Sequence, residues 1–210
     1  MTTTIPTLYG ITASRASRNL WLLEELGTPY ERVLTDFKNK GTHTLEFLAI
    51  NPNGHIPVLV DGAQVVWESL AINLYLAKKY GGPLSAQSLA EEGELLKWSF
   101  WAVTEIERDC LTVLMHTLVM PEAQRKPELA KQAEGALRKP FAVMEQHLAT
   151  HAYLLGDRFT VVDINLAAIV SWARPARELM ADHPYIARWL AACIGRDAYK
   201  KVQGFGKAEG

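Results

Sequence analysis

Three hydroxyl side chains stand close together near the start of the chain, in the segment "YGITASRASRNLWLLEELG" from Tyr9 to Gly27. They belong to Thr12, Ser14 and Ser17, and a helix is predicted to begin beside them. A hydroxyl at such a place commonly caps the helix by accepting hydrogen bonds from its first N–H groups. One of the three could instead be the catalytic hydroxyl of an enzyme. Ser14 is the best cap by pattern, and Ser17 falls inside the first turn, where a structural role is expected.

A second candidate site is the pair Glu68-Ser69, which stands where a predicted strand gives way to a predicted helix. The N-terminus of a helix offers unpaired N–H groups and a favourable field for an anion. Ser69 adds a hydroxyl donor, and the carboxylate of Glu68 attracts an ammonium group. An amino-acid head group carries both charges, so the pair suits such a ligand. In the alternative interpretation, Ser69 only caps its helix and Glu68 is solvated.

Two further patterns are not predicted to form a catalytic or metal site. His147 and His151 are four residues apart, a spacing that places two imidazoles on one helix face, but no third ligand is evident and no metal site is predicted. Thr160 and Asp163 have the spacing of a capping box. Asp163 is therefore predicted to be a folding residue and not a catalytic one.

The elements that must position these groups alternate over the first 80 residues. "TLYG" predicts a strand, and the helix after it ends at Gly27, where a helix end favours a left-handed residue. "YERVLTD" predicts a second strand, and "THTLEFLAI" a short helix with Leu45 and Leu48 facing inward. "IPVLVDGAQVVWE" predicts a hairpin, and "SLAINLYLAKKYGG" a further helix. The order β-α-β-α-β-β-α predicts an open α/β unit with a mixed sheet.

From about Ala90 to Lys201 the pattern is helical throughout. Long amphipathic runs cover residues 90–119 and 128–150, and shorter helices are predicted to begin near Thr160 and His183. The predicted organisation is an α/β domain over 1–81, a linker over 82–88 and an all-α domain over 89–210.

Composition excludes several classes of protein. The formal net charge is −1 and neither half is basic, so we expect no nucleic-acid partner. No segment approaches the roughly 18 apolar residues of a membrane span, and "MTTTIPTLYG" lacks the features of a signal peptide. Cys110 and Cys193 are too few for a disulfide framework and suit a reducing compartment. We therefore expect a cytoplasmic protein without a membrane partner.

Three motifs support a family resemblance that covers nearly the whole chain. "NPNGHIPVLVDG" (Asn51 to Gly62) looks like the segment NPxGxVPxLxDG, and "ESLAINLYLAKKY" (Glu68 to Tyr80) looks like ESxAIxxYL. "SRASRNLWLLEELG" is similar to the first helix of many bacterial members. With the predicted element order, the chain resembles the cytosolic glutathione S-transferases of the bacterial, theta-like, serine type. The resemblance implies a thioredoxin-like N-terminal domain followed by a C-terminal helical domain.

The resemblance also implies an activity, in which the thiol of glutathione is activated as a thiolate for attack on a small hydrophobic electrophile, as in detoxification. Glutathione would be the co-substrate, and no metal is required. Ser14 matches the position of the family's catalytic serine. Thr12 is the alternative, because related subgroups shift the catalytic hydroxyl by a residue or two.

A glutathione-binding set follows from the same motifs. The family uses Glu68 and Ser69 for the γ-glutamyl end, and it pairs glutathione with the backbone before a cis proline, here Ile56 before Pro57. His55 replaces the family's Gln or Lys, and His43 resembles a residue that binds the glycine carboxylate.

Parts of the helix over 90–119 line the electrophile pocket in the family, and other parts form a homodimer interface. Its aromatic stripe, which includes Trp98 and Trp101, is also typical of a core. Alternative functions on the same scaffold are glutathione-dependent peroxide or disulfide reduction, dehalogenation, isomerisation, a non-catalytic binding or regulatory role, and a structural role in a larger complex without glutathione.

Overall fold

The computed structural model describes residues 5–37 and 40–209 and divides into two compact units. The first unit comprises Met1–Ser85 together with Arg196–Gly210, and the second comprises Ala86–Gly195. The boundary after Ser85 falls inside the expected linker over 82–88. Residues 196–210, however, group with the first unit and not with the expected helical domain over 89–210. Residues 1–4 and 210, at the outer ends of the expected domains, lie outside the described residues.

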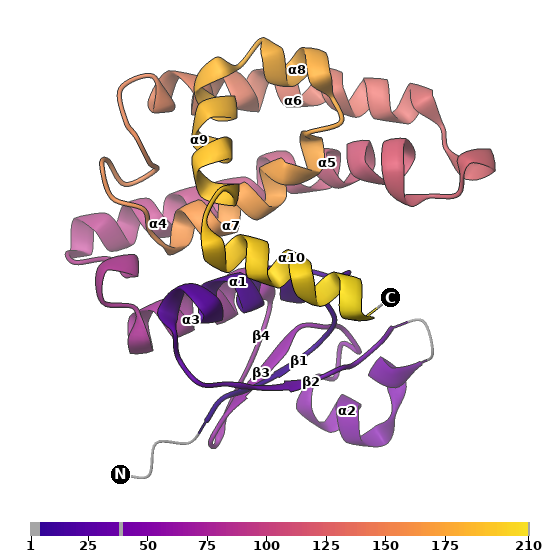
Figure 1. Ribbon diagram of the computed structural model, residues 1–210, viewed down its shortest axis with the longest axis vertical. Coiled ribbons are helices and arrows are strands. Elements are labelled where there is room, and N and C mark those ends of the chain that lie inside the picture. Colours follow the sequence, from indigo (N-terminus) through magenta and orange to yellow (C-terminus); the bar gives the residue numbers. More distant parts are fainter. Residues whose placement is uncertain (1–4, 38–39, 210) are drawn as a thin grey trace. The chain divides into compact units, whose positions relative to one another are not determined.

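The first unit is built on a mixed sheet whose described strands lie in the order β2-β1-β3-β4. β1 pairs with β2 in parallel, whereas the β1–β3 and β3–β4 pairs are antiparallel. Figure 1 shows α1 and α3 lying together along one side of this sheet, with α2 apart from them. The predicted order β-α-β-α-β-β-α is confirmed. The elements of this unit are β1 (Thr7–Tyr9), α1 (Ala16–Leu26), β2 (Glu31–Val33), α2 (Leu45–Ile50), β3 (Val58–Asp61), β4 (Gln64–Trp67), α3 (Ser69–Tyr80) and α10 (Asp197–Glu209).

The first two helices of this unit show one sequence signal that is followed and one that is not. α1 ends at Gly27, which has the left-handed φ of 61° predicted for a helix end. The prediction that Leu45 faces inward is wrong, because Leu45 is 85% exposed and Phe47 is the buried residue of α2. The helix begins at Leu45, and Phe47 lies about 200° further round, so the two side chains point to opposite sides.

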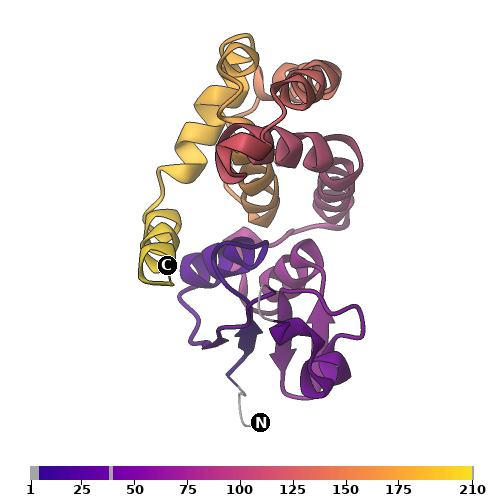
Figure 2. The ribbon, with the colours of Figure 1, turned by 90° about the vertical axis from the view of Figure 1, so that its right-hand side faces the viewer.

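The helix α10 belongs to the first unit because it packs against α1. The rings of Trp21 and Tyr199 meet edge to face with centroids 4.8 Å apart. At the surface of the contact, Lys201 forms an ion pair with Glu24 at 2.6 Å. Figure 2 shows α10, in yellow, running beside α1, in indigo. This packing explains why the expected domain boundary differs from the observed division.

The second unit is helical, and α7 lies at its core with every residue buried. The long run predicted over 90–119 is confirmed, with π-helical stretches at Ala102–Ile106 and Met115–Val119. The predicted helix starts near Thr160 and His183 are also confirmed. The helices of this unit are α4 (Leu89–Trp101), α5 (Glu107–Leu114), α6 (Pro127–Leu148), α7 (Val161–Val170), α8 (Arg177–Ala181) and α9 (Pro184–Ile194).

Candidate functional site

Three chain segments of the first unit leave the sheet at the same end. Tyr9 of β1 is paired with Val58 of β3, and Val58 is paired with Trp67 of β4. These three residues form one row across the sheet, in which neighbouring strands lie about 4.8 Å apart. The loop after β1 begins directly after this row, and the turn before β3 ends directly before it. α3 begins two residues after the row, at Ser69. The sheet therefore brings most of the predicted site residues to one end of its strands.

The loop after β1 holds Thr12 and Ser14 in different hydrogen bonds. Ser14 Oγ accepts from the backbone N–H of Ala16 at 3.1 Å and donates to the carbonyl of Ile11 at 2.6 Å. Ser14 thus supports the start of α1, although Arg15 occupies the formal cap position. Thr12 donates its hydroxyl hydrogen to the carboxylate of Glu209 at 2.7 Å.

Ser17 has the structural role that its position predicted. Its hydroxyl donates to the backbone carbonyl of Ser14 at 2.9 Å, so it helps to close the first turn of α1. Of the three hydroxyls in this segment, Thr12 and Ser14 lie in the loop before α1, and Ser17 lies within the helix.

The pair Glu68-Ser69 stands at the N-terminus of α3 with an unusual backbone. Glu68 occupies the cap position with a φ of 73°, a left-handed value that is uncommon for a residue with a side chain. Its side chain is exposed. Ser69 is the first residue of α3 and not its cap, so the interpretation of Ser69 as a simple cap is wrong. Ser69 is buried, and its Oγ accepts from Arg18 Nη1 at 3.1 Å, which leaves its own hydrogen able to donate elsewhere.

The turn before β3 is shaped by a buried asparagine. The side chain of Asn51 donates to the backbone carbonyl of His55 at 2.7 Å, and the side chain of His55 is exposed. The Ile56–Pro57 peptide bond is cis, as expected. A Cβ placed on Gly10 would lie 3.7 Å from the Cβ of Ile56, so this turn contacts the loop that follows β1.

His43 lies beside the same turn. A Cβ placed on Gly54 would lie 3.4 Å from His43 Nε2, and the glycine lets the imidazole approach the backbone next to His55. His43 Nδ1 is 3.0 Å from Thr42 Oγ1, so the ring is held by its neighbour while remaining exposed. Both predicted histidines thus flank one turn.

Three charged residues near this end of the strands were not predicted as site residues. Arg18 lies buried on α1 and donates to Ser69, while Arg32 of β2 forms an ion pair with Glu209 of α10. A charged residue within the buried run "SRNLWLL" is a signal for Arg18 that the sequence does carry. No local pattern marks Glu209, which is 197 residues from its partner Thr12.

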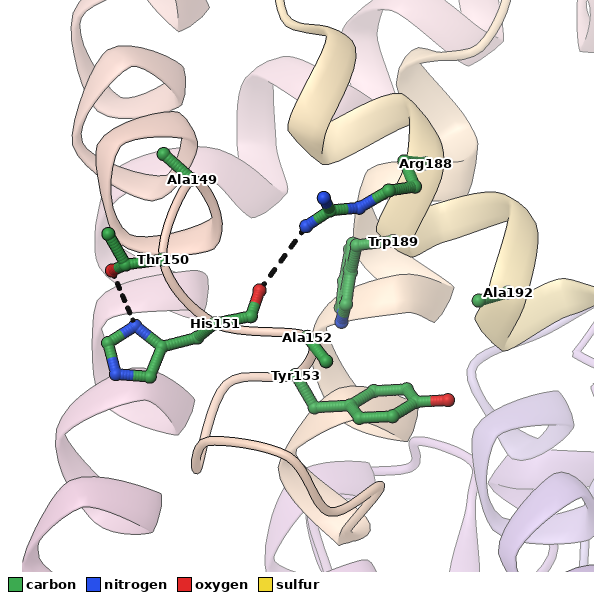
Figure 3. Close-up of a pocket in the computed structure, with 8 residues that line it drawn as sticks. All are labelled: Ala149, Thr150, His151, Ala152, Tyr153, Arg188, Trp189 and Ala192. Carbon is green, nitrogen blue, oxygen red and sulfur yellow. Dashed lines mark hydrogen bonds between the residues drawn. The ribbon is translucent and has the colours of Figure 1, made fainter.

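The second unit contains a cavity of about 440 Å³ (Figure 3). Figure 3 shows Arg188 reaching the carbonyl of His151, and the two groups form a hydrogen bond of 3.3 Å. None of the predicted site residues lines it. The lining residues are Ala149, Thr150, His151, Ala152, Tyr153, Arg188, Trp189 and Ala192.

The histidine pair and the aromatic stripe of the second unit have core contacts. His147 stacks on His151 with ring centroids 4.4 Å apart, and its Nε2 is 3.1 Å from the carbonyl of Leu154. Burial lowers the pKa of His147 below its usual value. Trp98 is buried and packs edge to face on Trp101 with centroids 5.2 Å apart. These side chains therefore support the packing of α4 and α6.

The predicted capping box is confirmed at the start of α7. The backbone N–H of Thr160 donates to Asp163 Oδ2 at 2.9 Å. Asp163 Oδ1 also accepts from the backbone N–H of Leu154 at 3.0 Å and from Trp189 Nε1 at 2.8 Å. The carboxylate thus joins a loop and a second helix to the cap.

Within the described ranges, 5–37 and 40–209, no group of three or more His, Cys, Asp or Glu side chains is arranged to hold a metal ion. No helix in the same ranges combines the length and the apolarity needed to cross a membrane.

Comparison with known proteins gives matches along most of the chain. Residues 6–78 match the family model described as "Glutathione S-transferase, N-terminal domain", and residues 108–197 match "Glutathione S-transferase, C-terminal domain". The chain is 35% identical over 205 residues to Glutathione S-transferase 3 of Zea mays, which covers 93% of this chain and 91% of that protein. It is 32% identical over 200 residues to Glutathione S-transferase GstB of Escherichia coli K12, covering 93% and 96% of the two chains. Among solved structures, the theta class glutathione S-transferase of Xanthomonas axonopodis pv. citri, with glutathione bound, matches with a TM-score of 0.84 at 30% identity, over 94% of this chain and 96% of that chain.

Proposed function

Because the chain belongs to the glutathione S-transferase family, we propose that it is a glutathione transferase in which Ser14 donates a hydrogen bond to the sulfur of glutathione. The family models match residues in both units, and glutathione is the co-substrate of this family. The assignment of residues rests on one observation. The loop after β1, the turn before β3 and the start of α3 converge at one end of the strands of the sheet. The theta-like serine subtype remains a prediction.

The start of α3 fits the γ-glutamyl end of glutathione. That end carries a carboxylate and an ammonium group. The hydroxyl of Ser69 and the first N–H groups of α3 are donors for the carboxylate, and the exposed carboxylate of Glu68 suits the ammonium group. The left-handed φ of Glu68 supports this role, since strained residues collect at binding sites.

The turn before β3 fits the rest of the tripeptide. Ile56 and Pro57 lie directly before β3, a position that suits strand-like pairing of the Ile56 backbone with an extended peptide. His55 and His43 flank this turn with exposed imidazoles, which suits contacts to the glycyl end. These assignments rest on the motifs together with the placement of the residues on one turn.

Ser14 is a better donor to sulfur than Thr12 because of what each hydroxyl already bonds. The Thr12 hydroxyl donates to the carboxylate of Glu209, and a hydrogen bond to an ionised acceptor is about twice as strong as a neutral one. The Ser14 hydroxyl donates to the neutral carbonyl of Ile11. Rotating Ser14 toward a thiolate therefore costs less than withdrawing Thr12 from Glu209.

Glutathione supplies the nucleophile, because its thiol loses its proton to solvent and the sulfur electron pair forms a bond to the electrophilic carbon while the leaving group departs with its own pair. The chain's part is to favour the charged form of the sulfur. The Ser14 hydroxyl and the positive end of α1 do so by hydrogen bonding and by field. Ser69 and Glu68 hold the tripeptide while this happens.

The proposal includes a hydrophobic electrophile, a homodimer and a cytoplasmic location. α4 exposes the apolar side chains of Leu96 and Phe100, and the π-helical stretch after it exposes Val103, which supports an interface on this part of the chain. Sedimentation equilibrium should give twice the mass of the chain. The cytoplasmic location is supported by the low number of cysteines.

The test of the catalytic assignment is the variant Ser14→Ala. Turnover with an aryl halide should fall at least about tenfold, the loss of one hydrogen bond to a charged group, while KM for glutathione stays within a few-fold. Ser17→Ala, which removes a hydroxyl from the same segment, is the matched control and should keep wild-type turnover. Unchanged turnover in Ser14→Ala contradicts the assignment.

Assays with an aryl halide, a peroxide and a mixed disulfide, each with glutathione, separate the proposed transferase from the reductase and peroxidase alternatives. Binding of glutathione without turnover of any of these substrates would favour a binding protein. A protein that a glutathione affinity column does not retain would favour a structural role.

A further inference from the structure

The last turn of α10 reaches the loop that carries Thr12 and Ser14 (Figure 1). Glu209 Oε2 accepts two hydrogen bonds from Thr12, one from its backbone N–H at 2.8 Å and one from its hydroxyl at 2.7 Å. Glu209 Oε1 forms an ion pair with Arg32 of β2. The side chain of Glu209 is only 14% exposed, so this carboxylate is largely withdrawn from solvent.

The contact is built by several neighbouring features of α10. A Cβ placed on Gly206 would lie 3.1 Å from Thr12 Oγ1, so a glycine on this face of the helix allows the close approach. The guanidinium of Arg32 lies over the ring of Phe205 at 5.1 Å from the centroid. Burial tends to raise the pKa of Glu209, but the hydrogen bonds from Thr12 and the charge of Arg32 outweigh it and lower the pKa. The carboxylate is therefore ionised at neutral pH.

One peptide plane connects Glu209 to Ser14. The N–H of Thr12, which donates to Glu209, and the carbonyl of Ile11, which accepts from Ser14, belong to the same peptide unit. A trans peptide is planar, with its N–H and C=O pointing in opposite directions, so fixing one end fixes the other.

We propose that Glu209 is a positioning residue, which holds the Ile11–Thr12 peptide plane and through it sets the place of the Ser14 hydroxyl. This inference rests on the proposed role of Ser14. In the structure, the carbonyl of Ile11 and the N–H of Ala16 hold Ser14 Oγ from two sides. When the hydroxyl hydrogen turns to the sulfur, the bond to Ile11 is given up, but Glu209 still holds Thr12, two residues before Ser14 in the same loop. Without Glu209 the N–H and the hydroxyl of Thr12 lose their shared acceptor, and the loop that places Ser14 is held less firmly.

The test compares Glu209→Gln with the wild-type enzyme saturated with glutathione. The fraction of bound glutathione present as thiolate, followed by ultraviolet absorbance against pH, should fall about threefold at neutral pH, which corresponds to a modest rise of the thiol pKa. The value of kcat should fall in step, while KM for glutathione stays within a factor of two because Glu68 and Ser69 are untouched. Glu209→Asp keeps the charge but shortens the side chain, and it should show the same loss.

The matched control is Lys201→Met, which removes another ion pair between α10 and α1 without contact to the loop. It should leave the thiolate fraction and kcat unchanged. A loss of thiolate in Lys201→Met equal to that in Glu209→Gln would show that α10 acts only through general stability, and would overturn the proposal.

The variant Ser14→Ala separates this inference from the proposed function. If Ser14→Ala lowers the thiolate fraction and Glu209→Gln does not, the role of Ser14 stands and the role of Glu209 falls. If Ser14→Ala has no effect, both fall. If both variants lower the fraction, the double variant should be no worse than Ser14→Ala alone, because Glu209 acts through Ser14. The exchange rate of the Thr12 amide, measured by NMR, should rise in Glu209→Gln and remain slow in Lys201→Met.

Discussion

At the scale of single residues, the hydroxyl of Ser69 shows how a buried neighbour changes what a side chain can do. The side-chain oxygen of a serine at a helix start usually accepts a hydrogen bond from one of the first N–H groups of the helix. Here the oxygen accepts from Arg18, and the cap position belongs to Glu68. The hydroxyl hydrogen and the first N–H groups of α3 are then left for a ligand. We therefore expect Ser69 to contribute to binding and not to turnover.

Replacing Ser69 with Ala should raise KM for glutathione about tenfold and change kcat less than twofold, because a hydrogen bond to a charged group contributes about 1.5 kcal/mol or more. Steady-state kinetics over a range of glutathione concentrations measure both constants. Ser88→Ala is a suitable control, since Ser88 caps α4 in the second unit by accepting from the N–H of Glu91 at 3.1 Å. An unchanged KM in Ser69→Ala would contradict the assignment of the γ-glutamyl site.

At the scale of elements, one carboxylate at the start of α7 makes more hydrogen bonds than a capping box requires. Asp163 is fully buried and accepts from Thr160, Leu154 and Trp189. Its bonds therefore connect the start of α7 to the preceding loop and to α9. A helix without solvent-facing residues has no water to replace these partners.

The variant Asp163→Ala should lose about 3 kcal/mol or more of unfolding free energy, because several buried donors are left without an acceptor. Asp163→Asn retains one carbonyl oxygen and should lose less. Urea denaturation measures both. Since Asp163 belongs to the second unit and to its folding, kcat per folded molecule should stay at the wild-type value. A fall in kcat without a fall in stability would show that Asp163 has a catalytic role.

At the scale of the whole molecule, the first unit is assembled from both ends of the chain. Residues near position 12 and residues near position 209 meet through α10. Two ion pairs attach this segment to α1, one from Arg196, just before α10, to Glu25 and one from Lys201 of α10 to Glu24. The third ionic contact, Glu209 with Arg32, lies at the loop that carries Ser14. The C-terminal segment is thus part of the unit in which we propose that glutathione binds.

Acidification should weaken the attachment of α10. The folded-state pKa of Glu209 is lowered below the usual 4.5, so its ionised form stabilises the fold above pH 4.5, and this contribution is lost as the pH falls through the folded-state value. The difference in unfolding free energy between wild type and Glu209→Gln should be about 1 to 2 kcal/mol near neutral pH and should shrink in acid. Urea denaturation across this range measures it.

The carboxylates of Glu24 and Glu25 are present in both proteins, so the difference between wild type and variant isolates Glu209. A difference that stays constant from neutral pH down to the acid range would contradict the prediction. In a Lys201→Met background, in which Glu209 and Arg32 are unchanged, the difference made by Glu209→Gln should keep the same acid dependence.

Much of the fold was predictable because the signals are local. The strand and helix order of the first unit, the hairpin, the left-handed Gly27 and the capping box at Thr160 each follow from residues within a few positions of one another. The motif from Asn51 to Gly62 and the pair Glu68-Ser69 also carried the family resemblance. Leu45 shows the limit, because one turn of helix does not decide which side faces the core.

The sequence by itself determined the family, the element order and the candidate hydroxyls, since spacing along the chain records them. Only the tertiary structure decided how those hydroxyls are bonded. Thr12 is bonded to Glu209, and Ser69 accepts from Arg18, through contacts between residues that are 197 and 51 positions apart. No local pattern encodes such pairs, because they arise only when α10 packs on α1 and α1 packs beside α3. What a hydroxyl can donate depends on the partner that packing gives it.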